Sequence, residues 1–348
     1  MTDRHTAPPA SARAETPIAF VNAIARAYLR RGMDPGGALK KAQIAPQLLE
    51  NPHNRITALQ MELVSGAAMQ ELDDEALGWF ERPLPWGSYG MLVRASLTAP
   101  NLGVALARWC RHHGLLTRSV ALDLTQHNGV ASLILTERQP LGEMQEFCVV
   151  STLRNALGVA CWLTDSRISL RATQLRFAPP AHAACYRVLF DGTTSFGATQ
   201  HSLQFDAGYL ALPVRRDEAA LARMLQRALL LTVRPYRRDR LLVDKVRQAL
   251  RQQPALGRNA EALAQWLALS SRTLHRQLRE EGASLQAIKD SVRRDLACEL
   301  LLRSRKPIKQ VAQAAGFDND KSFFRAFRLW TGCTPDDYRA HGTPGATP

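Results

Sequence analysis

The spacing of apolar residues predicts helices at first and then a mixture of strands and helices. Between residues 18 and 112 apolar positions recur every three or four residues, and from residue 120 they alternate with polar ones. Asn128-Gly129 separates two alternating segments and is typical of a tight hairpin turn. The predicted elements are helices over 18–31, 58–72, 101–112, 147–163 and 182–189, and strands over 120–124, 130–135, 168–177, 202–205 and 210–214. Helices mixed with antiparallel hairpins indicate an α+β domain of about 200 residues.

The last third of the chain has no alternating segment and is predicted to be all-α. A helix predicted over 218–232 ends before Pro235, and the basic run 234–240 follows, so the domain boundary is expected there. The length of 348 residues also favours two domains, because a single core rarely exceeds roughly 250–300 residues.

Positive charge is concentrated in this helical part. From residue 234 onward there are 22 Lys and Arg against 12 Asp and Glu, whereas the first 233 residues contain 23 against 19. A basic domain joined to a nearly neutral one indicates a polyanionic partner, with nucleic acid ahead of a membrane surface. No apolar run approaches the ~20 residues that cross a bilayer, so no membrane partner is expected.

A first helix-turn-helix unit is predicted over 259–281. Asn259 caps a short helix, a break follows at 268–270, and a second helix runs from Ser271 to about Glu281. The apolar positions of the two helices are Leu263, Trp266 and Leu267, then Leu274 and Leu278. The opposite face of the second helix carries Arg272, His275, Arg276 and Arg279. Such a cationic stripe suits a DNA major groove, although an arbitrary basic helix usually presents a solvated face.

The same pattern recurs downstream, which favours the DNA-binding interpretation. Pro307 is expected at the first position of a short helix that ends at Gly316, and a second helix is predicted over 320–331. Its apolar residues are Phe323, Phe324 and Phe327, and its polar side carries Lys321, Ser322, Arg325 and Arg328. A long helix over 284–304 joins the two units and spans roughly 30 Å. Successive major-groove faces lie ~34 Å apart, so the two units could read adjacent grooves of one duplex.

Three motifs in this region resemble the AraC/XylS family of bacterial transcription regulators. They are LALSSRTLHRQLREEG (267–282), IKQVAQAAGF (308–317) and SFFRAFRLWTGCTPDDYR (322–339). The first domain more loosely resembles that family's arabinose-binding-type effector domain, in GALKKAQ (37–43), YGMLVRASLTAPNLG (89–103) and FGATQHSLQFDAGYLALPV (196–214). One departure is Ala268, where the family often has glycine. If this position needs a positive φ, alanine costs about 1 kcal/mol.

The resemblance implies a division of the chain and a function. The expected segments are a disordered leader (1–16), an α+β effector-binding and dimerisation domain (17–216), a linker (217–240), a double helix-turn-helix DNA-binding domain (241–340) and a flexible tail (341–348). The chain is then a cytoplasmic, homodimeric, effector-responsive regulator, and an activator rather than a repressor. Its partners are double-stranded DNA, RNA polymerase and an unidentified small molecule, with no cofactor.

By position in the motif, the resemblance assigns DNA contacts to six residues: Arg272, His275, Arg276, Lys321, Ser322 and Arg325. Arginine is suited to guanine, while His275 and Ser322 can bond bases or phosphates. Arg279 and Arg328 are expected to contact phosphate or solvent. Asp320 could accept from a cytosine amino group, but the helix cap is the preferred interpretation.

The effector site is poorly marked in the sequence. Candidate aromatic residues for a cavity are Trp79, Phe80, Trp86, Tyr89, Trp109 and Trp162, although aromatic residues at helical spacing are more often plain core. Arg94 and Arg111 suit an anionic effector but are more simply surface residues. No metal site is expected, because His112-His113 has no ligand at suitable spacing and the six cysteines lie far apart, as buried free thiols.

Two other functions stay open on the sequence. An architectural or effector-independent DNA-binding protein explains the basic domain but not a neutral domain of about 200 residues. An enzyme is disfavoured, because the chain has no G-x-S-x-G, P-loop, G-x-G-x-x-G or H-E-x-x-H motif, although catalysis does not always leave such a motif.

Overall fold

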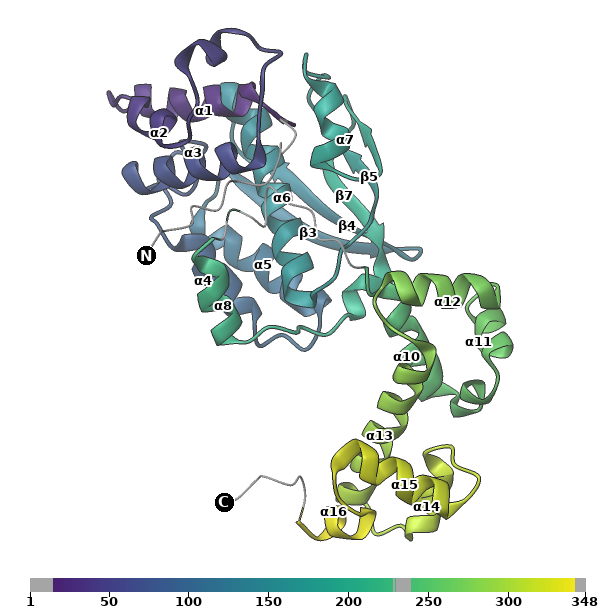
Figure 1. The fold of residues 1–348 in the computed structure, drawn as a ribbon. Coiled ribbons are helices and arrows are strands. Elements are labelled where there is room, and N and C mark those ends of the chain that lie inside the picture. Colours follow the sequence, from purple (N-terminus) through teal and green to yellow (C-terminus); the bar gives the residue numbers. More distant parts are fainter. Residues whose placement is uncertain (1–14, 228, 230–238, 342–348) are drawn as a thin grey trace, which may run out of the picture. The chain divides into compact units, whose positions relative to one another are not determined.

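A computed structural model describes residues 15–227, 229 and 239–341, and the chain divides into two compact units after Arg237 (Figure 1). The expected tail 341–348 and leader 1–16 therefore lie almost entirely outside the described residues. So do most of the basic run 234–240 and the end of the helix expected over 218–232.

The first unit combines helices with a small pair of strands and one larger sheet. Its helices are α1 (Ile18–Leu29), α2 (Gly36–Lys41), α3 (Ala58–Glu71), α4 (Ser88–Ser96), α5 (Leu102–Leu116), α6 (Gln145–Thr164), α7 (Tyr186–Leu189) and α8 (Glu218–Leu225). Its strands are β1 (Thr16–Pro17), β2 (Arg55–Ile56), β3 (Val120–His127), β4 (Val130–Glu137), β5 (Leu170–Gln174), β6 (Thr193–Ser195) and β7 (His201–Asp206). This confirms the predicted α+β class.

The larger sheet has the order β3-β4-β7-β5-β6, and α5 and α6 pack against it (Figure 1). The predicted hairpin is present, with Asn128 and Gly129 both at positive φ (47° and 74°). The strands are antiparallel except β5 and β6, which pair in parallel. Strand β6 is polar and short, which is why the apolar pattern did not predict it.

The strand predicted over 210–214 is wrong. After β7 the chain turns into a 3₁₀ helix (Ala207–Ala211), because the Asp206 carboxylate accepts a bond from the Gly208 N–H at 2.8 Å. The carbonyl of Leu212 then accepts from the N–H of Leu102, at the start of α5. The apolar residues of this segment are therefore used in packing beside α5 and not in a sheet.

Helix α6 is the central helix of the first unit. Together with the turn before it (Gly142–Thr164) it is long and apolar enough, by length and composition alone, to cross a membrane. However, 78% of its most apolar window is buried inside the unit, which is typical of a core helix. The sequence analysis predicted this helix over 147–163 but found no apolar run of membrane-spanning length, because Glu146 and Arg154 interrupt it.

The second unit is all-α, as predicted. Its helices are α10 (Leu241–Gln252), α11 (Ala260–Trp266), α12 (Ser271–Glu280), α13 (Leu285–Arg303), α14 (Ile308–Ala314), α15 (Asp320–Thr331) and α16 (Pro335–His341). It has two cores. The first is aliphatic and joins α10, α11, α12 and the start of α13, and the second is aromatic and joins the end of α13 with α14, α15 and α16. Helix α13, about 28 Å long, contributes to both.

Candidate nucleic-acid interface and effector cavity

The turns of the two helix-turn-helix units share one geometry. In the first, the N–H of Leu269 bonds to the carbonyl of Ala264, and in the second the N–H of Phe317 bonds to the carbonyl of Ala312. The residue before each donor has a positive φ, which is 56° at Ala268 and 80° at Gly316. The sequence prediction that Ala268 occupies a position suited to glycine is thus confirmed.

The recognition helices α12 and α15 begin in the same way. The Ser270 hydroxyl accepts a bond from the N–H of Thr273, and the Asn319 amide oxygen accepts one from the N–H of Ser322. Asn319 is therefore the helix cap, and the prediction that Asp320 caps α15 is wrong. Asp320 is exposed in the first turn, where its charge complements the helix dipole.

Counting from these caps, the buried positions of the two helices coincide. Leu274 corresponds to Phe323 and Leu278 to Phe327, and all four are at most 1% exposed. Three exposed basic positions coincide as well: Arg272 with Lys321, Arg276 with Arg325, and Arg279 with Arg328. Each helix thus anchors one face in its core and leaves a row of cations in solvent.

The other two predicted contact residues differ between the helices. His275 is exposed, but its counterpart Phe324 is half-buried and packs on the aromatic core. Ser322 is half-buried, and its counterpart Thr273 shares a hydrogen bond of 2.8 Å with the Ser270 hydroxyl. At this position α12 therefore exposes a histidine, whereas α15 packs a phenylalanine against its core.

Two details of the predicted units are wrong. Trp266 is 46% exposed and is not an inward position of α11, because the short helix ends there and Leu263 and Ala264 supply the buried contacts. Pro307 is the N-cap of α14 and not its first helical residue. The predicted Asn259 cap is confirmed by its bond from the N–H of Glu261 at 2.8 Å.

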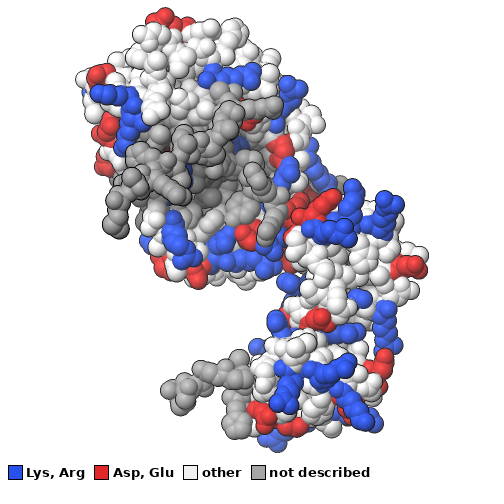
Figure 2. Space-filling model, in the orientation of Figure 1, with Lys and Arg blue, Asp and Glu red and all other residues white. Residues whose placement is uncertain are grey.

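Helix α13 is held at its start and near its middle. Ser284 caps its first turn by accepting from the N–H of Ala287, and the guanidinium of Arg293 lies 5.1 Å from the centre of the Phe317 ring in the second turn. Helix α13 is therefore fixed to the turn of the second helix-turn-helix unit as well as to the core of the first helix-turn-helix unit. Figure 2 shows Lys and Arg side chains gathered on the visible face of this helical unit.

Glu281 connects the end of α12 to the start of α10. Its two carboxylate oxygens accept bonds from the backbone N–H groups of Leu242 (3.1 Å) and Val243 (2.8 Å). Burial raises the pKa of this carboxyl to about 7, and the repulsion of Asp239 and Asp244 acts in the same direction. The two backbone bonds lower the pKa but do not compensate for burial.

The first unit contains a cavity of about 160 Å³. Its wall is mainly apolar and is formed by α1, α3, α6 and the loop that precedes α4, with Leu229 as a further contributor. Of the aromatic candidates, Trp79, Trp86 and Tyr89 line it, whereas Phe80, Trp109 and Trp162 belong to the surrounding core. Arg94 pairs instead with Glu218 on the surface, and Arg111 is exposed.

Comparison with known proteins identifies both units. Residues 32–214 match the family model of the N-terminal arabinose-binding domain of AraC transcription regulators, and residues 263–341 match a helix-turn-helix domain. The chain belongs to the AraC family of transcription regulators. It is a DNA-binding transcription regulator with an effector-binding N-terminal domain, as its sequence motifs implied.

Similar AraC-family proteins extend over nearly the whole chain. The ornithine utilization regulator of Pseudomonas aeruginosa is 29% identical over 327 residues, which cover 93% of this chain and 96% of that protein. The regulator VirS of Mycobacterium tuberculosis is 25% identical over 319 residues, 89% of this chain and 92% of its own. Among solved structures, the regulator CdpR from Pseudomonas aeruginosa is 20% identical with a TM-score of 0.33, covering 90% and 98% of the two chains.

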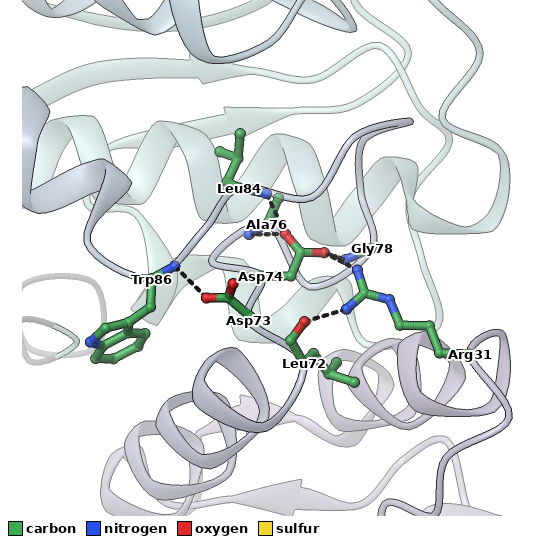
Figure 3. A network of polar contacts seen from close by, with 8 residues as sticks. All are labelled: Arg31, Leu72, Asp73, Asp74, Ala76, Gly78, Leu84 and Trp86. Atoms are coloured by element: carbon green, nitrogen blue, oxygen red, sulfur yellow. Dashed lines mark hydrogen bonds and ion pairs between the residues drawn. The ribbon is translucent and has the colours of Figure 1, made fainter.

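Three consecutive acids hold the cavity loop of this AraC-family domain in place. Asp74 accepts bonds from the N–H groups of Ala76, Gly78 and Leu84, and its carboxylate pairs with Arg31 at 2.7 Å (Figure 3). Asp73 accepts from the N–H of Trp86 at 2.9 Å (Figure 3). Carboxylates that accept several backbone bonds fix a loop strongly.

Glu75 continues this arrangement into the cavity wall. Its oxygens accept from the N–H groups of Gly87 (2.8 Å) and Tyr89 (2.7 Å), at the start of α4. Burial raises its pKa. Sequence analysis did not single out these acids, although three adjacent acids beside an apolar aromatic loop were a visible signal.

Arg154 is the main functional candidate that sequence analysis missed. It lines the cavity from the middle of α6, and its guanidinium lies 5.9 Å from the centre of the Phe190 ring. Burial lowers its pKa to about 10. The available signal was a single arginine within an otherwise apolar helix, because a buried charge usually has a specific use.

The described residues contain neither a candidate metal site nor a disulfide. Among the residues that the structure describes there is no group of three or more His, Cys, Asp or Glu side chains suited to a metal ion. His113 is fully buried in α5, and burial lowers its pKa to about 4. All six cysteines are free thiols, three of them buried and three partly buried.

Proposed function

We propose that this regulator reads a DNA operator by placing α12 and α15 in adjacent major grooves of one duplex. The observation that carries the proposal is the coincidence of three basic, exposed positions on two helices whose caps and buried positions also coincide. Helix α13 supports it, because its length of about 28 Å is close to the ~34 Å helical repeat of DNA.

The proposed base contacts come from the six predicted residues. Arg276 and Arg325 are the main readers, since both lie one turn and a half into their helices and arginine forms two bonds with guanine. Arg272 and Lys321 lie near the helix starts, and His275 and Ser322 make additional polar contacts. Arg279 and Arg328 are assigned to phosphate.

The first unit controls this activity through a small molecule bound in its cavity. A ligand changes operator binding only if its affinity differs between two states of the protein. We propose further that the protein is a cytoplasmic homodimer, associates through the first unit, contacts RNA polymerase and activates transcription. The catalytic alternative has little support, because the related proteins are transcription regulators.

The experiment is selection of bound fragments from random and genomic DNA, at several salt concentrations, with wild type and an Arg276→Ala/Arg325→Ala double variant. We expect a motif with two elements about one helical turn apart, which the double variant loses. The matched control is Arg303→Ala, since Arg303 is an exposed arginine at the far end of α13. Binding with a steep salt dependence and no preferred sequence would favour the architectural alternative instead.

A further inference from the structure

The cavity of the first unit has the size of a site for a small organic molecule. Its volume of about 160 Å³ is close to the roughly 150 Å³ of an engineered protein cavity that takes up benzene. In the described part of the chain, the aromatic side chains that line it are Phe20, Trp79, Trp86, Tyr89 and Phe147. The volume and these rings suit a ligand with one ring or a short alkyl chain.

Several of these rings are held in place by their neighbours. Phe20 and Trp79 both pack against Phe147, each with ring centres 5.3 Å apart. Tyr89 stacks on Trp109 with ring centres 6.1 Å apart. Rings that are fixed before a ligand arrives lose little conformational entropy when it binds. The face of an aromatic ring also attracts a cation, because its π-electrons make that face negative.

Glu75 places a carboxylate in this wall without a cation beside it. Glu75 lines the cavity and is 8% exposed. Its two oxygens accept bonds from the N–H groups of Gly87 and Tyr89, and each oxygen of an ionised carboxylate has a further lone pair. In the part of the chain that the structure describes, no Lys, Arg or His side chain pairs with it. A buried charge of this kind is stabilised by a counter-charge, which a cationic ligand can supply.

The acids that precede Glu75 add to this negative charge. Burial raises the pKa of Glu75, and the repulsion of Asp74 and Asp73 acts in the same direction. Arg31 pairs with Asp74 at 2.7 Å and so balances one of these three acids. The loop therefore presents a net negative charge at the cavity wall.

The cavity wall also carries a base, Arg154, and a second acid, Glu15. Burial lowers the pKa of Arg154 to about 10, and Asp191 acts in the opposite direction by stabilising the guanidinium. The charge of Arg154 is thus balanced in part from outside the cavity. With Glu15 and Glu75 against Arg154, the described lining has more negative than positive charge.

Building on the proposed effector function, on which this step rests, we propose that the ligand is a small organic amine. Its ammonium group bonds to the carboxylate of Glu75 beside the rings of Trp86 and Tyr89. Its apolar part lies against Phe20 and Phe147. A bond between an ammonium and a carboxylate in a buried site is stronger than a neutral hydrogen bond. An alcohol of the same shape leaves the carboxylate without a counter-charge, and an acid is repelled by it, so the site selects the amine.

The test uses the full chain with phenethylamine and hexylamine as probes. Phenethyl alcohol and hexanol are the neutral comparisons, and phenylacetate and hexanoate are the anionic ones. We expect the two amines to raise the melting temperature and to give binding heat. The alcohols and the acids should give neither at the same concentration.

Variants of the cavity loop locate the bound amine. Glu75→Gln should weaken amine binding by roughly ten- to a hundredfold, because it removes the anion. Trp86→Leu should weaken it by roughly three- to tenfold, because it removes a ring face. Glu81→Gln, at an exposed acid of the same loop, should leave amine binding unchanged. Thermal melting without ligand checks that each variant is folded.

Equal binding of amines, alcohols and acids by wild type, or no binding of either amine at millimolar concentration, overturns the proposal without recourse to any variant. An unchanged amine affinity in a folded Glu75→Gln variant overturns it as well. Operator affinity measured with each probe separates these results from the proposed function. Amine binding that leaves operator affinity unchanged contradicts effector control only. An operator response to an acid but to neither amine contradicts the ligand class only.

Discussion

The two helix-turn-helix units of this AraC-family regulator have the same backbone geometry but different core residues. The buried core of the first consists of leucine, valine, isoleucine and alanine, whereas that of the second combines Phe323, Phe327 and Tyr338 with alanine, leucine and valine. In the second core, Phe323 contacts Phe317, Phe324 and Phe327 with ring centres 5.4 to 6.2 Å apart. Aromatic pairs of this kind add to the stability gained by burial.

The same contrast extends to the turns and to the outer faces. The first unit keeps an alanine at positive φ where the second has glycine, and it exposes His275 where the second buries part of Phe324. The first helix-turn-helix unit thus combines a costlier backbone and an all-aliphatic core with an exposed histidine on its second helix. We expect the first helix-turn-helix unit to contribute more to sequence reading and the second helix-turn-helix unit more to stability.

The largest expected effect separates the two cores. Phe323→Ala should destabilise the protein by roughly 3–5 kcal/mol, and Leu274→Ala at the corresponding position by roughly 2–5 kcal/mol, with the aromatic site the more costly. Leu329→Ala, at an 84% exposed leucine of the same helix as Phe323, should change stability by less than about 0.5 kcal/mol. Chemical denaturation measures all three, and a larger loss at Leu274 would reverse the comparison.

The next effect concerns DNA. Arg276→Ala and Arg325→Ala should each weaken operator binding by roughly 1–3 kcal/mol and relax the sequence preference, each at a different element of the operator. Arg279→Ala and Arg328→Ala should weaken binding on all sequences and reduce its salt dependence. Titrations on operator and on mutated operators distinguish the two patterns. If Arg276→Ala weakens binding equally on every sequence, that arginine is a phosphate contact.

Of the two helix-turn-helix units, the first is expected to show a pH effect, through Glu281. Because its folded pKa of about 7 lies above the ordinary 4.5, folding favours the protonated form. Its contribution to stability is therefore greatest below pH 4.5 and is lost as the pH rises toward 7, by at most about 1.4 kcal/mol per pH unit. Glu281→Gln should flatten this dependence and leave the protein more stable than wild type at pH 8. Melting curves from pH 5 to 8 decide the matter, and an unchanged slope in the variant contradicts the assignment.

The smallest effect is a reciprocal exchange in the two turns. Ala268→Gly should stabilise the first helix-turn-helix unit by about 1 kcal/mol, and Gly316→Ala should destabilise the second helix-turn-helix unit by a similar amount. Space is not the cause, because a Cβ at Gly316 meets only the end of the Arg293 side chain at 3.6 Å. Denaturation midpoints of the two single variants and of the double variant measure the exchange. Two shifts of the same sign would show that backbone strain is not the difference.

Local features of the DNA-binding unit could be predicted from sequence. The bounds of α15 follow from apolar spacing and turn chemistry, which act within a few residues, whereas the positive φ at Ala268 was suggested by the glycine that the family often has there. Trp266 was misplaced because a helix of seven residues has too few turns for spacing alone to define its inner face.

The cavity of the N-terminal unit could not be predicted in this way. Phe20, Trp79, Phe147 and Arg154 come from segments far apart in the chain, and only the packing of the first unit brings them to one wall. Apolar periodicity shows that such residues are inward-facing, but not whether a core or a cavity lies inside.

The bonds from Glu281 to the start of α10 have a consequence for exchanging parts between regulators. Although the chain divides after Arg237, helix α12 depends on the N–H groups of Leu242 and Val243 and on the α10 side chains in its core. A transplanted DNA-reading module must therefore carry α10 with it. Hybrids joined upstream of Asp239 keep α10 together with Glu281. Hybrids joined between α10 and α11 instead place Glu281 against the first helix of a different protein.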